Sequence, residues 1–310
     1  TTVITVRPTG PAGTNCVGSD FTVSVTVYPP IAISASSNSP VCAGDAINLS
    51  STPAGSATPY SFSWSGPLSY GSSAEDPTIS SATTSMSGAY GVTVTDNNSC
   101  TASATTSVTV NASPDDKTVS AVDATVCVGG STNISVSSSQ SSVSYQLRDN
   151  ATNTNIGSAV TGTGGTISLG TGAISANKTF NVLATLGTCT KVMSVTPTVT
   201  VVAVPTVSIT GNGDVCAGGT VTLTAVPSGG VGTYTYAWTR GGSAVGTNAS
   251  TYATSTALTA GTYSYVVAIS NSLGCNASSS SVNANVVADP SISAHPANAT
   301  VCLGGGGSFQ

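Results

Sequence analysis

Charge is the scarcest property of this chain. Of its 310 residues, only 5% are Asp, Glu, Lys or Arg, against about 25% in ordinary soluble domains. The six basic residues are scattered along the sequence, and the formal net charge is −5. Phosphate binding needs clustered Lys and Arg, which this composition lacks. The chain is therefore not expected to bind nucleic acid.

The side chains that most enzymes depend on are also scarce. His295 is the single histidine and has Pro296 beside it, and Glu75 is the single glutamate. A Ser-His-Asp triad or a pair of catalytic carboxylates has almost nothing to be built from. The glycine run 304–307 has no Lys-Ser/Thr after it, so it does not form a phosphate-binding loop. We expect no catalytic site and no enzyme activity.

Long apolar runs are missing as well. No stretch approaches the ~20 residues that a membrane-spanning helix requires, so no membrane span is expected. The sequence starts at Thr1 without an initiator methionine or a signal peptide, and both ends fall inside a repeat. We therefore expect the chain to be a segment of a longer protein.

Serine and threonine supply most of the polarity, because together they make up about a third of the residues. Threonine is β-branched and suits a pleated strand while it keeps a hydroxyl in water. Hydrophobic residues reach 39%, and Val and Ile alternate with polar residues in many short stretches. This pattern predicts β structure with buried cores and argues against disorder.

A four-residue motif, Val-Cys-x-Gly, organises the whole sequence. We call its four cysteines the motif cysteines: Cys42, Cys127, Cys216 and Cys302. A second set, the turn cysteines, consists of Cys16, Cys100, Cys189 and Cys275. The steps between successive members are 85, 89 and 86 residues in the first set and 84, 89 and 86 in the second. Two sets that recur together indicate a tandem array.

A proline lies 11 to 13 residues before each motif cysteine and marks the domain boundaries. The predicted division is 1–29 (end of one repeat), 30–113, 114–204 and 205–289 (three whole repeats) and 290–310 (start of another). Each whole repeat shows about seven short strand patterns separated by turn signals, which is typical of a Greek-key β-sandwich. The predicted fold is all-β, with immunoglobulin-like sandwiches in a linear array.

Aromatic residues support this fold. Trp64 and Trp238 match the core tryptophan of immunoglobulin-like domains, and the Gly-x-Tyr sequences ending at Tyr90 and Tyr263 match their tyrosine corner. Val92 and Tyr265 stand where the usual inter-sheet cysteine would follow. The middle repeat is the divergent one.

In that middle repeat Leu147 replaces the tryptophan, and Phe180 takes the place of the tyrosine. Pro197 interrupts its last strand, which predicts an edge or a bulge there.

These motifs resemble the tandem immunoglobulin-like and PKD-like repeats of very large surface adhesins and secreted proteins of the Bacteroidota, many exported by the type IX system. The resemblance rests on Val-Cys-x-Gly, on the Tyr-x-Phe/Tyr-x-Trp strand and on the cysteine-containing turn before the last strand. It implies a stalk or adhesin at the cell surface. It carries over no catalytic or ligand-binding residue.

Eight regularly placed cysteines, without a CxxC pair or a histidine at ligand spacing, predict disulfides rather than zinc. Disulfides place the protein in an oxidising compartment, outside the cell. One pairing lies within repeats: Cys42–Cys100, Cys127–Cys189 and Cys216–Cys275. Sandwich topology argues against it, because a seven-residue strand of ~23 Å separates the two cysteines of a repeat, whereas bonded Cα atoms lie within ~7 Å.

The alternative pairing joins consecutive repeats. In a linear array the end where the chain leaves one repeat meets the end where it enters the next. This places Cys42 beside Cys189 and Cys127 beside Cys275, the two pairs that we favour. The remaining cysteines, Cys16, Cys100, Cys216 and Cys302, would then pair outside this segment. A displaced first strand would instead permit the pairing within repeats.

Two other kinds of site deserve a prediction. Trp64 and Trp238 would serve as sugar-stacking platforms if exposed, but their place on an alternating strand favours the core; the same applies to Tyr60 and Tyr234. Asp115, Asp116 and Asp123 lie near a domain junction and supply part of the six to eight oxygen ligands of Ca²⁺. A solvated linker is the favoured interpretation of these three aspartates, so no cofactor is expected.

The leading functional hypothesis is a structural segment of an extracellular adhesin stalk or surface filament. Its partners would be neighbouring repeats of the same chain, with other copies in a filament, surface glycans or other cells as further candidates. A glycan-binding module is one alternative, with residues 114–204 as its best carrier. A spacer within a large secreted enzyme is another.

Overall fold

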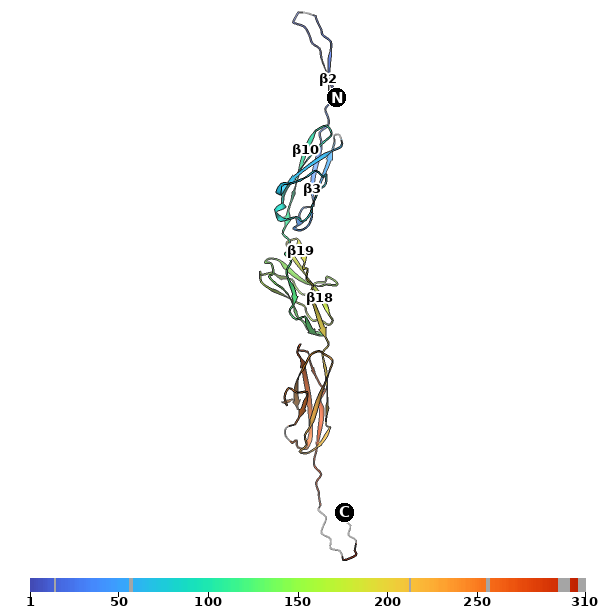
Figure 1. Cartoon of the computed structure of the whole chain (residues 1–310), viewed down its shortest axis with the longest axis vertical. Coiled ribbons are helices and arrows are strands. Elements are labelled where there is room, and N and C mark those ends of the chain that lie inside the picture. Colours follow the sequence, from blue (N-terminus) through green and yellow to red (C-terminus); the bar gives the residue numbers. More distant parts are fainter. Residues whose placement is uncertain (14, 56–57, 212, 255–256, 295–301, 306–310) are drawn as a thin grey trace.

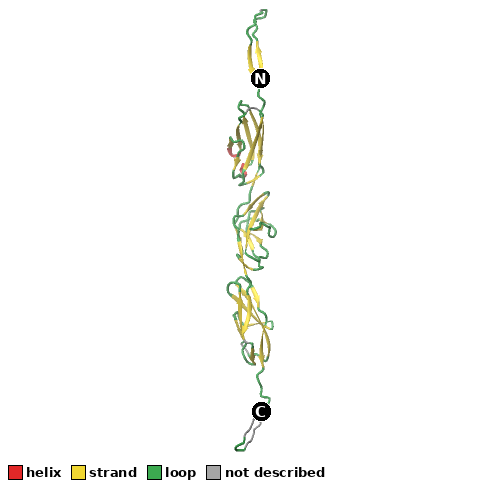
Figure 2. Cartoon of the chain, turned by 90° about the vertical axis from the view of Figure 1, so that its right-hand side faces the viewer, coloured by secondary structure: helices red, strands yellow, loops and turns green. Residues whose placement is uncertain are grey.

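The protein is described from a computed structural model that covers residues 1–310 except 14, 56–57, 212, 255–256, 295–301 and 306–310. It is an all-β protein of tandem immunoglobulin-like sandwiches. The three whole repeats lie end to end in one line, with a hairpin at the N-terminal end (Figure 1). Strands dominate the described residues, and helix is confined to two single turns in the first repeat, η1 (Pro67–Ser69) and η2 (Thr84–Met86) (Figure 2).

Repeat 1 is built from two facing sheets of order β3-β5-β8 and β10-β9-β6-β7. Its strands are β3 (Ala32–Ser37), β4 (Val41–Cys42), β5 (Ile47–Ala54), β6 (Ser61–Gly66), β7 (Tyr70–Ser72), β8 (Thr78–Ile79), β9 (Gly88–Thr95), β10 (Thr101–Val108) and β11 (Val110–Asn111). The chain changes sheet between β5 and β6, returns between β7 and β8, and changes again between β8 and β9, which gives the Greek-key connection. The short β4 pairs in parallel with β11.

Repeats 2 and 3 follow the same plan. Repeat 2 contains β12 (Val119–Ala121), β13 (Thr125–Cys127), β14 (Asn133–Val136), β15 (Ser144–Asp149), β16 (Val160–Thr161), β17 (Ile167–Gly170), β18 (Lys178–Leu186), β19 (Cys189–Val192) and β20 (Thr198–Val202). Repeat 3 contains β21 (Thr206–Gly211), β22 (Asp214–Cys216), β23 (Thr222–Ser228), β24 (Tyr234–Arg240), β25 (Ser243–Val245), β26 (Thr251–Ala253), β27 (Gly261–Asn271), β28 (Asn276–Ser278) and β29 (Val282–Val287). Their sheets have the orders β12-β14-β17 with β13-β20-β18-β15-β16, and β21-β23-β26 with β22-β29-β27-β24-β25.

The two ends of the chain carry less structure. The first 29 residues contain one antiparallel hairpin, β1 (Thr2–Val6) with β2 (Phe21–Val25). Cys16 lies between its strands, as Cys100 lies between β9 and β10 and Cys275 between β27 and β28. In the described part of 290–310 no strand forms.

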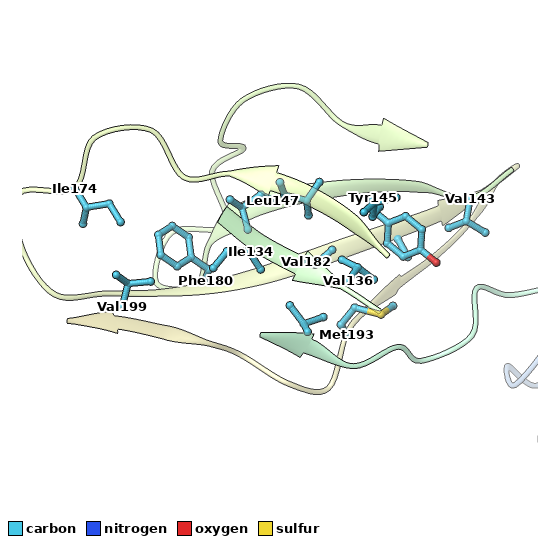
Figure 3. Packing of buried hydrophobic residues seen from close by; sticks show 14 of the residues in the cluster. Ile134, Val136, Val143, Tyr145, Leu147, Ile174, Phe180, Val182, Met193 and Val199 are labelled. Carbon is cyan, nitrogen blue, oxygen red and sulfur yellow. The ribbon is translucent and has the colours of Figure 1, made fainter. Parts of the chain in front are cut away.

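Each repeat encloses its own core between the two sheets, as the period-two alternation requires. Trp64 and Trp238 are both 2% exposed, so the prediction that they pack in the core is confirmed. In repeat 2 the equivalent Leu147 is buried together with Tyr145 and Phe180 (Figure 3). Three separate cores make each repeat a packing unit of its own.

The tyrosine corner is also present in repeats 1 and 3. The hydroxyl of Tyr90 donates to the carbonyl of Met86 at 3.0 Å, and that of Tyr263 donates to the carbonyl of Thr259 at 3.1 Å. Phe180 has no hydroxyl for this bond in repeat 2.

The strand count differs from the sequence expectation. Within the described residues each whole repeat has nine strands rather than about seven. The first strand divides in two, because the chain crosses from one sheet to the other before the Val-Cys-x-Gly motif. The strand that carries the tryptophan also gains a short hairpin partner, β7 or β25. The last strand is divided as well, into β10 and β11, β19 and β20, and β28 and β29. Pro197 lies between β19 and β20, so the structure has a break there, where the sequence predicted an edge or a bulge.

Candidate functional site: the junctions between repeats

The Val-Cys-x-Gly motif lies at the end of each whole repeat from which the chain leaves, here called the C-pole. In every case the motif cysteine is the parallel partner of the last residue of the last strand. The pairs are Cys42 with Asn111, Cys127 with Val202 and Cys216 with Val287. The register thus brings each motif cysteine to within a few residues of the next repeat.

The backbone conformation at the fourth position of the motif explains why that residue is glycine. Gly44, Gly129 and Gly218 have φ of 100°, 78° and 81°, a region that side chains disfavour and that position i+2 of a type II turn requires. The N–H that follows the glycine closes this turn onto the carbonyl of the cysteine, as from Gly130 to Cys127 at 2.8 Å. The glycine N–H itself reaches the opposite loop, as from Gly129 to the carbonyl of Ile174 at 2.8 Å. The cysteine therefore sits on a fixed turn.

The turn cysteines lie at the opposite end, the N-pole, where the chain enters a repeat. In repeat 3 the Asn271 side chain accepts hydrogen bonds from the N–H groups of Leu273, at 3.0 Å, and Cys275, at 2.9 Å. Asp96 organises the same turn in repeat 1, with N–H donors from Asn98 at 2.9 Å and Cys100 at 2.8 Å. An Asx-type turn thus holds both cysteines.

In repeat 2 a shorter turn places the turn cysteine, Cys189, at the N-pole. There Gly187 and Thr188 connect β18 directly to β19, and Leu186 pairs with Cys189. Both Cys189 and Cys275 are buried.

Two disulfides join consecutive repeats. Cys42 bonds to Cys189 across 147 residues, and Cys127 bonds to Cys275 across 148; the Cα atoms are 5.7 Å apart in each pair. These are the two pairs favoured from the sequence, and the pairing within repeats does not form. We call each of these disulfides a staple. The other four cysteines, Cys16, Cys100, Cys216 and Cys302, are free.

Each junction has a second covalent connection, the linker. Two residues separate the last strand of one repeat from the proline of the next: Ala112 and Ser113 before Pro114, and Ala203 and Val204 before Pro205. Both prolines are buried, and the hydroxyl of Ser113 donates to the carbonyl of Ala43 in repeat 1 at 2.6 Å.

Few polar contacts add to the staple and the linker. Asn111 donates to the Thr188 hydroxyl at 3.5 Å at the first junction, and the carbonyl of Leu273 lies 3.9 Å from the sulfur of Cys127 at the second. Clefts open to solvent flank both staples, lined by residues of both repeats.

The three candidate aspartates make separate local contacts. Asp115 and Asp116 follow the linker of the first junction, whereas Asp123 lines the cleft at the second. Asp115 pairs with Lys117 at 3.2 Å. Asp116 accepts a hydrogen bond from the N–H of Ser194 at 3.1 Å, and hydrogen bonding with Ser194 holds the pKa of Asp116 below its usual value. Within the described residues no group of three or more His, Cys, Asp and Glu is placed to hold a metal ion.

Asp123, the third aspartate, exchanges two hydrogen bonds with Thr132, both of 3.0 Å. The three carboxylates are thus each engaged by a different part of repeat 2.

The aromatic candidates are placed as follows. Both tryptophans are buried, which removes them as sugar-stacking platforms. Tyr60 and Tyr234 are half-buried at the edge of the core rather than fully inside it, because their hydroxyls donate to the carbonyls of Gly55 and Gly229. His295 lies outside the described residues. No helix in the described part of the chain is long and apolar enough to cross a membrane.

The sequence carries a signal for the N-pole turn. An Asp or Asn stands four residues before the turn cysteine in repeats 1 and 3, at Asp96 and Asn271. That spacing is typical of a side chain that accepts from the backbone of its own turn.

Comparison with known proteins adds the following likenesses. The chain is similar to a three-domain I-band fragment of titin, with 11% identity, a TM-score of 0.41 and coverage of 85% of this chain and 100% of that one. It is also similar to the eight N-terminal immunoglobulin domains of Down syndrome cell adhesion molecule, with 17% identity, a TM-score of 0.32 and coverage of 91% and 38%.

A third likeness is to three N-terminal domains of the highly immunogenic outer capsid protein of bacteriophage RB49, with 15% identity, a TM-score of 0.35 and coverage of 84% and 99%. No protein-family model matches the sequence, and the search of curated proteins gave no significant match. At these identities the likeness concerns the fold alone.

Proposed function

We propose that this chain is a stiff section of an extracellular stalk or surface filament, of the kind found in bacterial adhesins, which holds a distal binding region away from the cell. The observation that carries the proposal is the staple at each junction between whole repeats. A single short linker leaves two sandwiches free to bend about one point. A second covalent connection at the same junction restricts both bending and twisting.

The oxidising conditions that disulfides need support a location outside the cell, at its surface. The partners engaged by the staples are neighbouring repeats of the same chain. Surface glycans or other cells are assigned to the distal region, because the tryptophans of these repeats are buried. A spacer inside a larger secreted enzyme would use the same stiffness, and the sequence of the full-length protein distinguishes the two contexts.

Small-angle X-ray scattering of the oxidised chain tests the stiffness. We expect a rod-like particle whose radius of gyration decreases in the double variant Cys42→Ser/Cys189→Ser, because repeats 1 and 2 then bend about a single linker. The matched control is Cys16→Ser/Cys302→Ser, which removes two free thiols and should leave the scattering unchanged. A compact oxidised particle, with the three repeats clustered, would refute the proposal.

A further inference from the structure

Two poles of the array carry half of a staple without a bonded partner. One is the C-pole of repeat 3 with the free thiol of Cys216, and the other is the N-pole of repeat 1 with the free thiol of Cys100. Each of these two poles has the same backbone hydrogen bonds as the equivalent pole that carries a disulfide.

The C-pole of repeat 3 has the backbone arrangement of the bonded C-poles. Ala217 donates to the carbonyl of Val287 at 2.7 Å, as Val128 donates to Val202 at 2.9 Å in repeat 2. The turn closes from Gly219 to the carbonyl of Cys216 at 2.9 Å. The turn is thus formed without a disulfide to hold it, and it presents an exposed thiol.

The N-pole of repeat 1 likewise copies the bonded N-pole of repeat 3. Asp96 is 5% exposed and Asn271 is 6% exposed, and each accepts from the N–H of the turn cysteine four residues later. The backbone bonds from Asp96 N–H to the Cys100 carbonyl, at 3.0 Å, and from Asn271 N–H to the Cys275 carbonyl, at 3.1 Å, are also shared. Cys100 is therefore held as Cys275 is.

The hairpin before repeat 1 gives an independent indication of what lies on that side. Ile4 pairs with Val23 and Val6 pairs with Phe21, so these side chains lie on one face of the hairpin. They are 41% to 67% exposed. The hairpin has the order of the last strands of a repeat, with Cys16 as its turn cysteine, and in the whole repeats that face is covered by the opposite sheet.

We propose that these two poles are docking surfaces for further repeats of the same type, and that a staple closes each contact. Cys216 bonds to the turn cysteine of a following repeat, and Cys100 bonds to the motif cysteine of a preceding one. In each closure two thiols lose two protons and two electrons to a disulfide oxidant such as glutathione disulfide, which is released as two thiols. Stapling is then a property of every junction and not only of the two observed here.

One variant chain tests both poles at once. Residues 1–289 are followed directly by residues 30–310, so that repeat 3 precedes a second copy of repeat 1 through a linker of the native length, Ala288 and Asp289 before Pro30. After refolding with reduced and oxidised glutathione, non-reducing peptide mapping should find Cys216 of the first copy bonded to Cys100 of the second. Thiol titration should count four free thiols, as in the original chain, because the new staple consumes the two added ones.

The matched control is Cys216→Ser in the first copy, which should raise the reactivity of Cys100 in the second copy and leave all other staples intact. The proposal is overturned if both thiols stay free while the staples within each copy form. It is equally overturned if Cys16 or Cys302 cross-links to these cysteines as readily. The inference extends the proposed stalk function but fails separately from it, because scattering reports the stiffness of the two original junctions whether or not the new one closes.

Discussion

At the scale of single residues, each tryptophan both fills the core with its ring and donates a hydrogen bond from its indole N–H. The indole N–H of Trp64 donates to the carbonyl of Glu75 at 3.2 Å, and that of Trp238 donates to the carbonyl of Ala249 at 3.0 Å. Each bond reaches eleven residues along the chain and fastens the loop after the hairpin onto the core. The ring fills the space between the sheets, and its one polar atom is satisfied.

We expect Trp64→Ala to destabilise repeat 1 by about 3–5 kcal/mol, because the substitution leaves a cavity of aromatic size. Repeat 3 should respond little, since stability in arrays is lost locally. Urea unfolding followed by circular dichroism measures the loss. The fluorescence of Trp238, then the only tryptophan left, serves as the internal control for repeat 3. A loss below about 1 kcal/mol would show that Trp64 contributes little to the core.

The sequence reveals these core residues because burial leaves a period-two pattern and because aromatic residues recur at equivalent positions. Leu147 and Phe180 are recognised by the same alignment. The parallel pairing of β4 with β11, by contrast, cannot be predicted from the sequence. It involves two residues in each strand, and two residues are too few to show a period. The split first strand, the divided last strand and the short hairpin partners β7 and β25 leave equally little pattern in the sequence, so the sequence predicts fewer strands than form.

At the scale of elements, the turn that holds Cys275 depends on one side chain. Asn271 is buried and accepts two backbone N–H groups. Asp96 does the same in repeat 1, so a carboxylate and an amide are interchangeable here as acceptors. The turn is preorganised by local hydrogen bonds before any disulfide forms.

We expect Asn271→Ala to cost about 1–3 kcal/mol, because two N–H groups lose their acceptor in a partly buried turn. It should also slow formation of the Cys127–Cys275 staple, since Cys275 is no longer held in place. Quenched refolding with peptide mapping measures that rate, and urea unfolding measures the stability. Asn271→Asp is the matched control and should retain both properties, as Asp96 does. Equal rates for the Ala and Asp variants would show that the side chain does not position the cysteine.

The staples were accessible from sequence because the two cysteine sets recur at one period, and because sandwich topology sends them to opposite poles. The local geometry of each pole, however, could not be predicted from the sequence. The short parallel bridge and the loop carbonyl that accepts from the motif glycine both depend on tertiary contacts. The shorter turn at Gly187 also departs from the pattern of the other repeats, although it delivers Cys189 to the equivalent place.

At the scale of the whole molecule, the two staples interleave along the chain. The first spans residues 42–189 and the second spans 127–275. The shortest covalent path therefore runs from Thr1 to Cys42, across to Cys189, back to Cys127, across to Cys275 and on to the C-terminus. That path contains roughly 140 residues instead of 310. At about 3.6 Å per residue it limits the fully unfolded oxidised chain to ~500 Å, against ~1,100 Å for the reduced chain.

Interleaving makes the effect of removing staples strongly non-additive, and force spectroscopy on the chain held at its two ends measures it. Cys42→Ser alone, or Cys127→Ser alone, leaves a path of roughly 160 residues and should add only ~80 Å to the final extension. Removing both should add ~600 Å. Disulfides within repeats would instead add nearly equal lengths at each removal, because their loops do not overlap. Equal increments would therefore contradict the stapled array, whereas a small first step followed by a large second one is the signature of two interleaved staples in a stalk under tension.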